Sequence, residues 1–415
     1  MSNKLIVLMI DGVSAEYFVT SRGRLPHLSA LAERGLVVND LRSEVLGTSI
    51  PGRTSILTGT TADVSGIYGN KIWDTHIQDF RYANPYDVRV PTLPQRMKDA
   101  ERESAVLGFG MVRPEDATIF RSPWWVDELI QRARDSQPVT SDEGWLKVYR
   151  SRTDSRFSVW CNLVGFPEEW LDVGGDNSAE RLLRGAMSDM QAFNWVGIVA
   201  SHADTPDLIM SEFVLPDTVQ HYTGYKSAFS HWSIMQADAA IGMMLSRLSS
   251  AGVLDEWNIA IMSDHGHSPI KTAIHPHVIL PNVKMQSEGS VLLVAPKDDT
   301  ERKYITQSLM NYSCMPFHVD FVPDDHRQDL MAFVAPDRHS FELDDSDEIA
   351  TTGKPIHRSS HGLRPGLPGD DRFAIFAGPD IPKGRIDDAD AIQITPTCAK
   401  LLGLNLDDFA GEPLI

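Results

Sequence analysis

The pattern of apolar positions predicts buried strands that alternate with helices. A continuous apolar run at 5–10 is typical of a strand buried on both faces of a parallel sheet. The mainly apolar stretches 104–108, 207–215, 258–262 and 373–377 are also predicted to be strands. Apolar residues at helical spacing predict helices over 25–34, 91–100, 178–193, 225–251 and 391–402. This order of elements indicates an α/β protein built on a doubly wound, mostly parallel sheet.

The alternation is lost in two segments, 111–177 and 286–355, which we interpret as insertions that form a cap or substrate subdomain. The metal-binding core is then predicted from three segments, 1–110, 178–285 and 356–415. Tryptophans are concentrated in the first insertion: Trp124, Trp125, Trp145 and Trp160. For these side chains, packing in a satellite core is favoured over lining a pocket. The second insertion contains predicted strands at 290–294 and 331–334, and an acidic run at 344–348 that is expected to be a solvated loop.

Composition narrows the classes of function. A net charge of −19 over 415 residues argues against binding a nucleic-acid polymer, because such surfaces need clustered lysine and arginine. A phosphate ester is still compatible with this charge, because bound metal ions invert the local potential. The cysteines, Cys161, Cys314 and Cys398, are far apart, which disfavours a disulfide framework or a thiolate zinc site. The apolar run at 5–10 is too short for a membrane span, so we expect a cytoplasmic protein without a membrane partner; homo-oligomerisation stays open.

Carboxylates and histidines recur where predicted strands end. They are Asp11, Asp217 with His221, Asp264 with His265, and His361. Because strand ends of a doubly wound sheet converge on one edge, three carboxylates and three imidazoles should meet there. Gathered carboxylates repel one another and call for cations; mixed Asp and His ligands suit zinc, with manganese or iron as alternatives. Six ligands exceed the needs of one tetrahedral ion, which indicates a two-metal site. The alternative is a set of turn and cap residues without metal.

The stretch 45–59 contains a second candidate for chemistry. Thr48 and Ser49 precede Pro51 and Gly52, a glycine that would let the backbone approach a ligand, and a helix is predicted to begin just beyond Arg53. A hydroxyl group beside a helix N-terminus suits an oxyanion such as phosphate or sulfate. A turn that only caps the helix is the other interpretation.

Together these motifs resemble the alkaline phosphatase superfamily, and within it the nucleotide pyrophosphatase/phosphodiesterase branch and relatives such as phosphonoacetate hydrolase. The resemblance covers the three core segments. It implies two zinc ions, one held by Asp217, His221 and His361 and the other by Asp11, Asp264 and His265. It also implies that Ser49 is the nucleophile and a metal ligand. Asn70, in the Gly-Ile-x-x-Asn turn, would bind the phosphoryl group.

The sequence departs from the branch in two places: Ser65 stands where a histidine is usual, and Gln220 where a glycine is usual. The segment 49–53 with Leu57-Thr58-Gly59 also resembles the sulfatase signature, in which a Cys or Ser becomes formylglycine. That family usually has paired aspartates after the first strand and one metal, so the lone Asp11 and the Asp217/His221 pair favour the two-metal interpretation. Arg53 could bind a substrate oxygen or pair with a core carboxylate.

The function implied is a two-zinc phosphodiesterase or nucleotide pyrophosphatase that forms a covalent phospho-Ser49 intermediate. Its substrate would be a small phosphate ester or phosphonate. The alternatives are phosphonoacetate hydrolase-like or phosphomonoesterase activity, and sulfatase or phosphonate monoester hydrolase activity with formylglycine at position 49. A metal-binding sensor without catalysis is the alternative of a different class.

Overall fold

A computed structural model describes residues 3–43, 46–126, 178–343, 350–363, 366–367 and 369–415. Within these residues the core is a nine-stranded sheet in the order β19-β2-β18-β8-β1-β7-β5-β6, with β20 beside β2. The strands are β1 (Leu5–Ile10), β2 (Leu36–Arg42), β5 (Ser104–Leu107), β6 (Ile119–Arg121), β7 (Leu208–Phe213), β8 (Asn258–Met262), β18 (Arg372–Ala377), β19 (Gly384–Ile386) and β20 (Ala389–Asp390). Only β18 pairs antiparallel with its neighbours among these described strands, which confirms the predicted mostly parallel α/β sheet.

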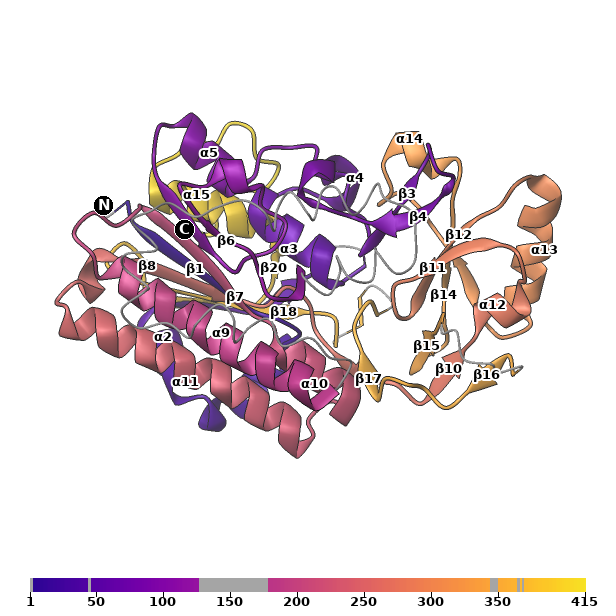
Figure 1. Cartoon of the computed structure of the whole chain (residues 1–415), viewed down its shortest axis with the longest axis horizontal. Helices are drawn as coiled ribbons and strands as arrows, with labels where there is room; N and C mark the ends of the chain where they lie inside the picture. The colour runs from indigo at the N-terminus through magenta and orange to yellow at the C-terminus, as the bar shows by residue number, and fades with distance from the viewer. Residues whose placement is uncertain (1–2, 44–45, 127–177, 344–349, 364–365, 368) are drawn as a thin grey trace.

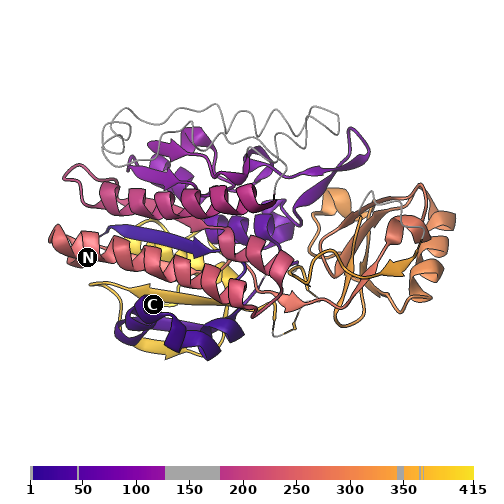
Figure 2. The same cartoon turned by 60° about the horizontal axis from the view of Figure 1, so that its bottom comes forward.

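Helices cover both faces of the sheet (Figures 1 and 2). One face packs against α1 (Ala15–Ser21), α2 (Pro26–Arg34), α9 (Ser178–Ala200), α10 (Leu215–Thr223) and α11 (Ala228–Ser250). The other packs against α3 (Ser49–Thr58), α4 (Ala62–Ser65), α5 (Leu93–Asp99) and α15 (Ile394–Leu402). Alternate residues of β1 point into the two cores, Leu5 and Val7 into one and Ile6 and Leu8 into the other.

A separate lobe follows β8 in the chain (Figure 1). Its antiparallel sheet has the order β11 (Lys284–Ser287), β12 (Val291–Ala295), β14 (Met331–Val334) and β13 (Met315–Phe317), and α13 (Asp299–Met310) packs on it. The predicted strands at 290–294 and 331–334 correspond to β12 and β14. Ile274 and Leu280, which the sequence placed in the core segment, pack in the apolar cluster of this lobe. Most of the first insertion, with Trp145 and Trp160, and the acidic run at 344–348 lie outside the described residues.

Three local differences from the expected elements concern the site. Helix α3 begins at Ser49 and not beyond Arg53, because Pro51 falls in the first helical turn, where a missing N–H is tolerated. The strand predicted at 207–215 ends at Phe213, and α10 begins at Leu215. Strand β2 was not predicted, because its Asn39 and Asp40 are residues that strands disfavour. Among the described residues, no helix is long and apolar enough to cross a membrane.

Candidate active site

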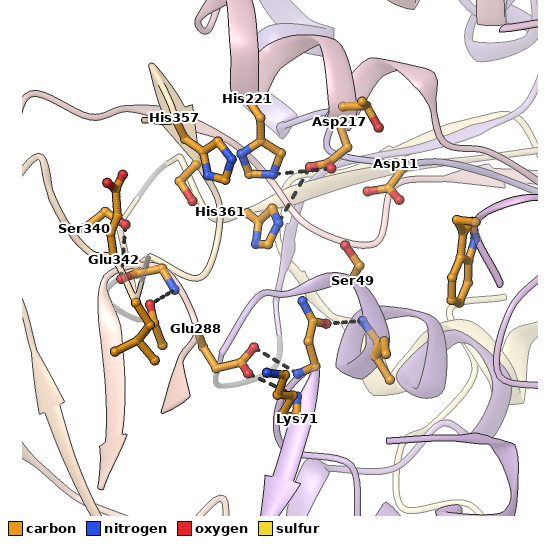
Figure 3. A pocket seen from close by; sticks show the side chains of 18 of the residues that line it. Asp11, Ser49, Lys71, Asp217, His221, Glu288, Ser340, Glu342, His357 and His361 are labelled. Atoms are coloured by element: carbon orange, nitrogen blue, oxygen red, sulfur yellow. Dashed lines mark hydrogen bonds and ion pairs between the residues drawn. The ribbon is translucent and has the colours of Figure 1, made fainter. Parts of the chain in front are cut away.

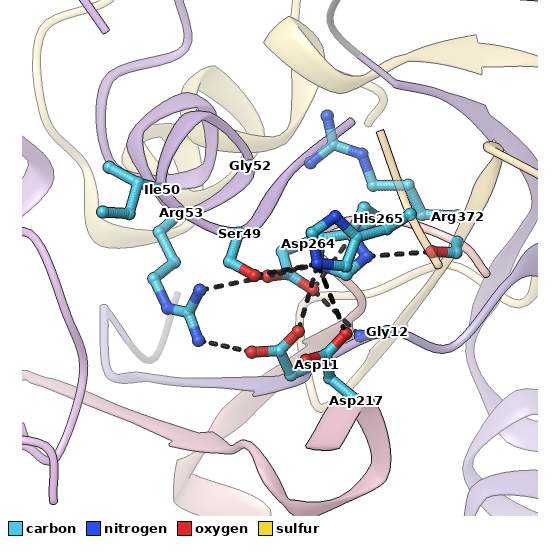
Figure 4. A network of polar contacts seen from close by, with 12 residues as sticks. Asp11, Gly12, Ser49, Ile50, Gly52, Arg53, Asp217, Asp264, His265 and Arg372 are labelled. Atoms are coloured by element: carbon cyan, nitrogen blue, oxygen red, sulfur yellow. Dashed lines mark hydrogen bonds and ion pairs between the residues drawn. The ribbon is translucent and has the colours of Figure 1, made fainter. Parts of the chain in front are cut away.

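Ser49 is the first residue of α3, and Thr48 before it is extended (φ −120°, ψ 163°) with no side-chain cap bond. The Ser49 Oγ lies 3.0 Å from Nε2 of His265 (Figure 4). The hydroxyl group therefore lies at the N-terminal end of the helix, which carries a partial positive charge, directly beside an imidazole.

Two glycines allow helices to approach the strand ends closely. Gly12 follows β1 with φ +74°, and a Cβ there would lie 3.0 Å from the Cα of Asp217 on α10. A Cβ on Gly52 would lie 2.4 Å from the carbonyl oxygen of Asp264. Gly52 was expected to bring the backbone close to a ligand; the structure shows instead that it lets α3 pack against Asp264, two residues after β8.

The structure places the predicted metal ligands in two groups of three whose donor atoms lie within 4.8 Å of one another: Asp217, His221 and His361, and Asp11, Asp264 and His265. Figure 3 shows members of both groups around one pocket. His361 differs from the expected arrangement. It follows β17 (Ser359–Ser360), which pairs with β9 (Ser268–Pro269) and not with the central sheet. The convergence of strand ends therefore explains the positions of Asp11 and Asp264. His361 is instead positioned by a separate two-stranded sheet, β17 with β9.

Backbone carbonyls fix the orientation of two imidazoles. Nδ1 of His221 lies 3.0 Å from the carbonyl oxygen of Ser359, and Nδ1 of His265 lies 2.9 Å from that of Gly266. Because a carbonyl only accepts, each Nδ1 donates, which leaves Nε2, on the side of the carboxylates, as the ring nitrogen that could bind a cation. Nε2 of His221 is 3.4 Å from Oδ2 of Asp217. Each group combines carboxylate oxygens with an imidazole whose Nδ1 is already hydrogen-bonded, and such a set of donors fits a divalent cation.

The pKa values within the cluster are shifted in opposite directions. Burial and then the charge of Asp11 raise the pKa of Asp264 to about 7. Burial lowers the pKa of His265, but Asp264 and Asp11 outweigh it and raise that pKa to about 10. Burial, followed by the charge of His265, holds the pKa of His361 well below its usual value. Such crowding of like charges is the setting in which bound cations are stabilising.

Arg53, one turn after Ser49 on α3, pairs with three carboxylates. Its Nε lies 2.8 Å from Oε2 of Glu212, its Nη2 2.5 Å from Oδ2 of Asp11 and its Nη1 3.4 Å from Oδ2 of Asp264. The guanidinium is only 2% exposed. Figure 4 shows it directed at Asp11 and Asp264. Arg53 thus pairs with core carboxylates; a contact with substrate stays a prediction.

Asn70 is held by contacts at both ends. Its Oδ1 accepts from the backbone N–H of Ile50 at 2.9 Å, and its own N–H donates to Oε2 of Glu288 at 2.9 Å. Glu288 also accepts from the N–H of Lys71 at 3.2 Å and is buried, which raises the pKa of its carboxyl to about 7. No motif in the sequence indicates this role, because Glu288 lies 218 positions from Asn70 and accepts hydrogen bonds there from backbone N–H groups.

Helix α10 is fixed by two buried side chains that sequence reasoning also missed. The Asp189 carboxylate on α9 accepts from the N–H groups of Val214 and Leu215, each at 2.7 Å, at the start of α10. Gln220 donates from Nε2 to the carbonyl oxygen of Gly12 at 2.7 Å. The glutamine that departs from the branch motif therefore joins α10 to the end of β1.

A cavity of about 650 Å³ opens over these groups. Its lining includes Ser49, Asn70, Asp11, Asp217, His221 and His361 together with Tyr82, Trp124, Trp125, Tyr222, Glu288 and Phe341. The two described tryptophans of the first insertion line the pocket, and Trp125 also packs against an apolar core cluster, the kind of role that was favoured. Their indole N–H groups donate to the buried carboxylates of Asp189 and Glu212, at 2.9 and 2.5 Å, which holds the rings at the pocket.

The sequence matches the family described as type I phosphodiesterase/nucleotide pyrophosphatase over residues 5–352. The chain belongs to this family. The match confirms the resemblance inferred from the motifs. An uncharacterized pyrophosphatase/phosphodiesterase of Schizosaccharomyces pombe is 24% identical over 319 residues, which cover 74% of this chain and 55% of the relative. A human N-sulphoglucosamine sulphohydrolase is 24% identical over 286 residues, or 64% of this chain and 50% of the relative.

A third relative, bis(5'-adenosyl)-triphosphatase of Xenopus laevis, is 20% identical over 316 residues and is matched over 72% of this chain and 56% of its own length. The chain therefore spans about half the length of the curated relatives it matches. Among solved structures, human ectonucleotide pyrophosphatase/phosphodiesterase 5 aligns with a TM-score of 0.69 at 15% identity, over 99% of this chain and 97% of that chain. At this identity the alignment shows that the two proteins share a fold.

Proposed function

We propose that this member of the type I phosphodiesterase/nucleotide pyrophosphatase family is a two-metal hydrolase of phosphoric diesters or pyrophosphates that acts through a phospho-Ser49 intermediate. One observation carries the proposal: the Ser49 hydroxyl, 3.0 Å from Nε2 of His265, faces the same cavity as both ligand groups (Figure 3). Zinc is the proposed metal because each group combines carboxylate and imidazole donors, with manganese or iron as alternatives.

Zinc ions bound there would lower the pKa of the serine hydroxyl and neutralise charge on the phosphoryl oxygens. Oγ of Ser49 gives up its proton to solvent and forms a bond to phosphorus, as the leaving oxygen departs with the electron pair of its P–O bond and takes a proton from solvent. Water then adds to phosphorus, the P–Oγ bond breaks, and Oγ of Ser49 regains a proton from that water. Asn70 would bind a phosphoryl oxygen, a role supported by its contacts with Ile50 and Glu288, which fix its position beside Ser49. Arg53 neutralises the carboxylates behind the metal sites.

The substrate class is inferred from the cavity and the relatives. The Xenopus relative is named as a bis(5'-adenosyl)-triphosphatase, and a murine phosphodiesterase 5 structure was solved in complex with AMP. A cavity of about 650 Å³ with Tyr82, Tyr222 and Phe341 in its lining suits an ester that carries a planar group. Phosphomonoesters and phosphonates such as phosphonoacetate are the alternative substrates. Neither a nucleic-acid polymer nor a membrane is a proposed partner.

A sulfatase or phosphonate monoester hydrolase is the second candidate. It is favoured by the segment 49–53 and by the match to a human sulphohydrolase. Ser49 would then be converted to formylglycine. This candidate leaves the group of Asp217, His221 and His361 without a use, and for that reason we rank it second.

The test combines metal analysis with a substrate panel. Metal content is measured by plasma mass spectrometry, beside rates on p-nitrophenyl phosphate, bis-p-nitrophenyl phosphate, a phenylphosphonate ester and p-nitrophenyl sulfate. About two zinc ions per chain and fastest cleavage of the diester support the proposal. One calcium, fastest sulfate cleavage and a peptide mass showing formylglycine at position 49 would favour the sulfatase candidate. Metal binding without any hydrolysis would favour a sensor.

A further inference from the structure

A seventh polar side chain, His267, lies against the two ligand groups. It follows His265 by two residues, and Gly266 between them packs so closely that a Cβ would lie 1.9 Å from the carbonyl oxygen of Gly369. His267 is fully buried. Its ring centroid is 4.7 Å from that of His221 and 5.8 Å from that of His361. It is nevertheless outside both groups of three candidate ligands found among the described residues.

One polar contact accounts for its position. Nε2 of His267 lies 3.2 Å from Oδ1 of Asp217, and in the described part of the chain neither ring nitrogen of His267, nor this oxygen, makes a hydrogen bond of normal geometry. The second oxygen of the same carboxylate, Oδ2, lies 3.4 Å from Nε2 of His221. The two oxygens of Asp217 thus face different histidines. Its carboxylate rotates about a soft torsion, so a partner on one oxygen decides where the other points.

We propose that His267 is a positioning residue that donates from Nε2 to Oδ1 of Asp217 and so orients this carboxylate to bind a metal ion with His221 and His361. The inference rests on the proposed function, because it assigns metal binding to that group. The turn that carries the ring packs closely at Gly266, where a Cβ would meet the carbonyl oxygen of Gly369, so His267 can hold a carboxylate that comes from another element, α10. Partners of this kind, beyond the ligands themselves, change metal affinity about 10–100-fold.

The experiment measures metal affinity in the full chain, independently of catalysis. Chelator-stripped protein is titrated with zinc against a chromophoric competitor, which gives the stoichiometry and the affinity of each site. His267→Phe keeps the ring shape without a donor, and His267→Gln places an amide N–H near the position of Nε2. His275→Gln is the matched control, because His275 is also buried but its Nδ1 lies 2.8 Å from the carbonyl oxygen of Ala350 and it belongs to neither ligand group. His267→Asn, whose shorter amide does not reach Asp217, replaces the Phe variant should that variant not fold.

We expect His267→Phe to weaken one of the two zinc sites about 10–100-fold, with His267→Gln and His275→Gln close to wild type. Unchanged affinity in His267→Phe would overturn the proposal. Loss of a whole zinc equivalent in both the Phe and the Gln variants would also overturn it, because His267 would then be a direct ligand. Failure of the proposed function gives a different result from failure of the His267 proposal. In that case the wild type would bind fewer than two zinc ions, or the Asp217→Ala variant would still bind two.

Discussion

Replacing Arg53 by methionine tests how the site balances its buried charges. The guanidinium is 2% exposed, and its partners Asp11, Glu212 and Asp264 are 2%, 1% and 0% exposed. Burial lowers the pKa of Arg53, but Glu212, Asp11 and Asp264 outweigh it and raise the pKa well above its usual value, so the cation persists at any working pH. Methionine keeps the apolar stem without the charge.

The expected loss of unfolding free energy follows from the buried carboxylates that Arg53→Met leaves without a cation. Removing one member of a buried ion pair costs about 3–5 kcal/mol, because the other member stays buried and uncompensated. We therefore expect metal-stripped Arg53→Met to lose at least about 3 kcal/mol of unfolding free energy. In zinc-loaded protein the loss should be smaller, since cations would neutralise Asp11 and Asp264. Glu212 would keep the N–H groups of Trp125 and Gly110 as donors.

Urea unfolding of stripped and zinc-loaded protein measures both quantities. Arg42→Met is the matched control, because Arg42 also pairs with two carboxylates, Asp388 and Asp390, but is 51% exposed and should lose at most about 1 kcal/mol. Adding Glu212→Gln to Arg53→Met should restore part of the stability, since it removes one uncompensated charge. A stripped Arg53→Met protein no less stable than Arg42→Met would refute the reasoning.

Three further predictions concern single residues of the site. Ser49→Ala should lower kcat/KM for bis-p-nitrophenyl phosphate by at least about a thousandfold while both ligand groups still bind metal; a wild-type rate would exclude the nucleophile. Burial raises the pKa of Glu288 from 4.5 to about 7. The protonated carboxyl group therefore contributes fully to the unfolding free energy below pH 4.5, and this contribution is lost as the pH rises through 7. Glu288→Gln should therefore lose less unfolding free energy than wild type between pH 5 and pH 8, by up to about 3 kcal/mol in urea titrations; parallel pH profiles would contradict this. Gly12→Ala should destabilise by about 1–3 kcal/mol in the same assay, because φ is +74° and the added Cβ meets Asp217 at 3.0 Å; wild-type stability would show that α10 can move away.

Strands that are buried on both faces could be predicted from the sequence, because burial demands mainly apolar residues. Strands β1, β7 and β8 are buried at every position, and their mainly apolar sequences identified them; only β1 is apolar throughout. The antiparallel direction of β18 leaves no trace in its composition, which is as apolar as that of the parallel strands. β2 was missed because Asn39 and Asp40 interrupt its apolar pattern; it lies between β19 and β18 near one edge of the sheet.

The candidate metal ligands could be predicted because they recur in motifs after predicted strands. The side chains that hold these motifs in place could not, because they are distant from them in the sequence. Asp11 and Asp264 follow apolar strands, so their convergence could be expected from topology. Glu288, Asp189 and Trp124 carry no motif, because each acts through one or two hydrogen bonds to groups distant in the sequence. Such contacts depend on packing, which local pattern does not encode.

The short ligand helix α10 shows why these distant contacts matter. A helix of nine residues is not stable by itself in water, so tertiary contacts must hold α10. Asp189 binds its first N–H groups, the Gln220 side chain binds the end of β1, and the Ser359 hydroxyl donates to the Gln220 carbonyl at 2.7 Å. Glycine at position 220 would remove the second of these contacts. The departure from the branch motif therefore adds an attachment that keeps Asp217 in register with the carboxylate at the end of β1.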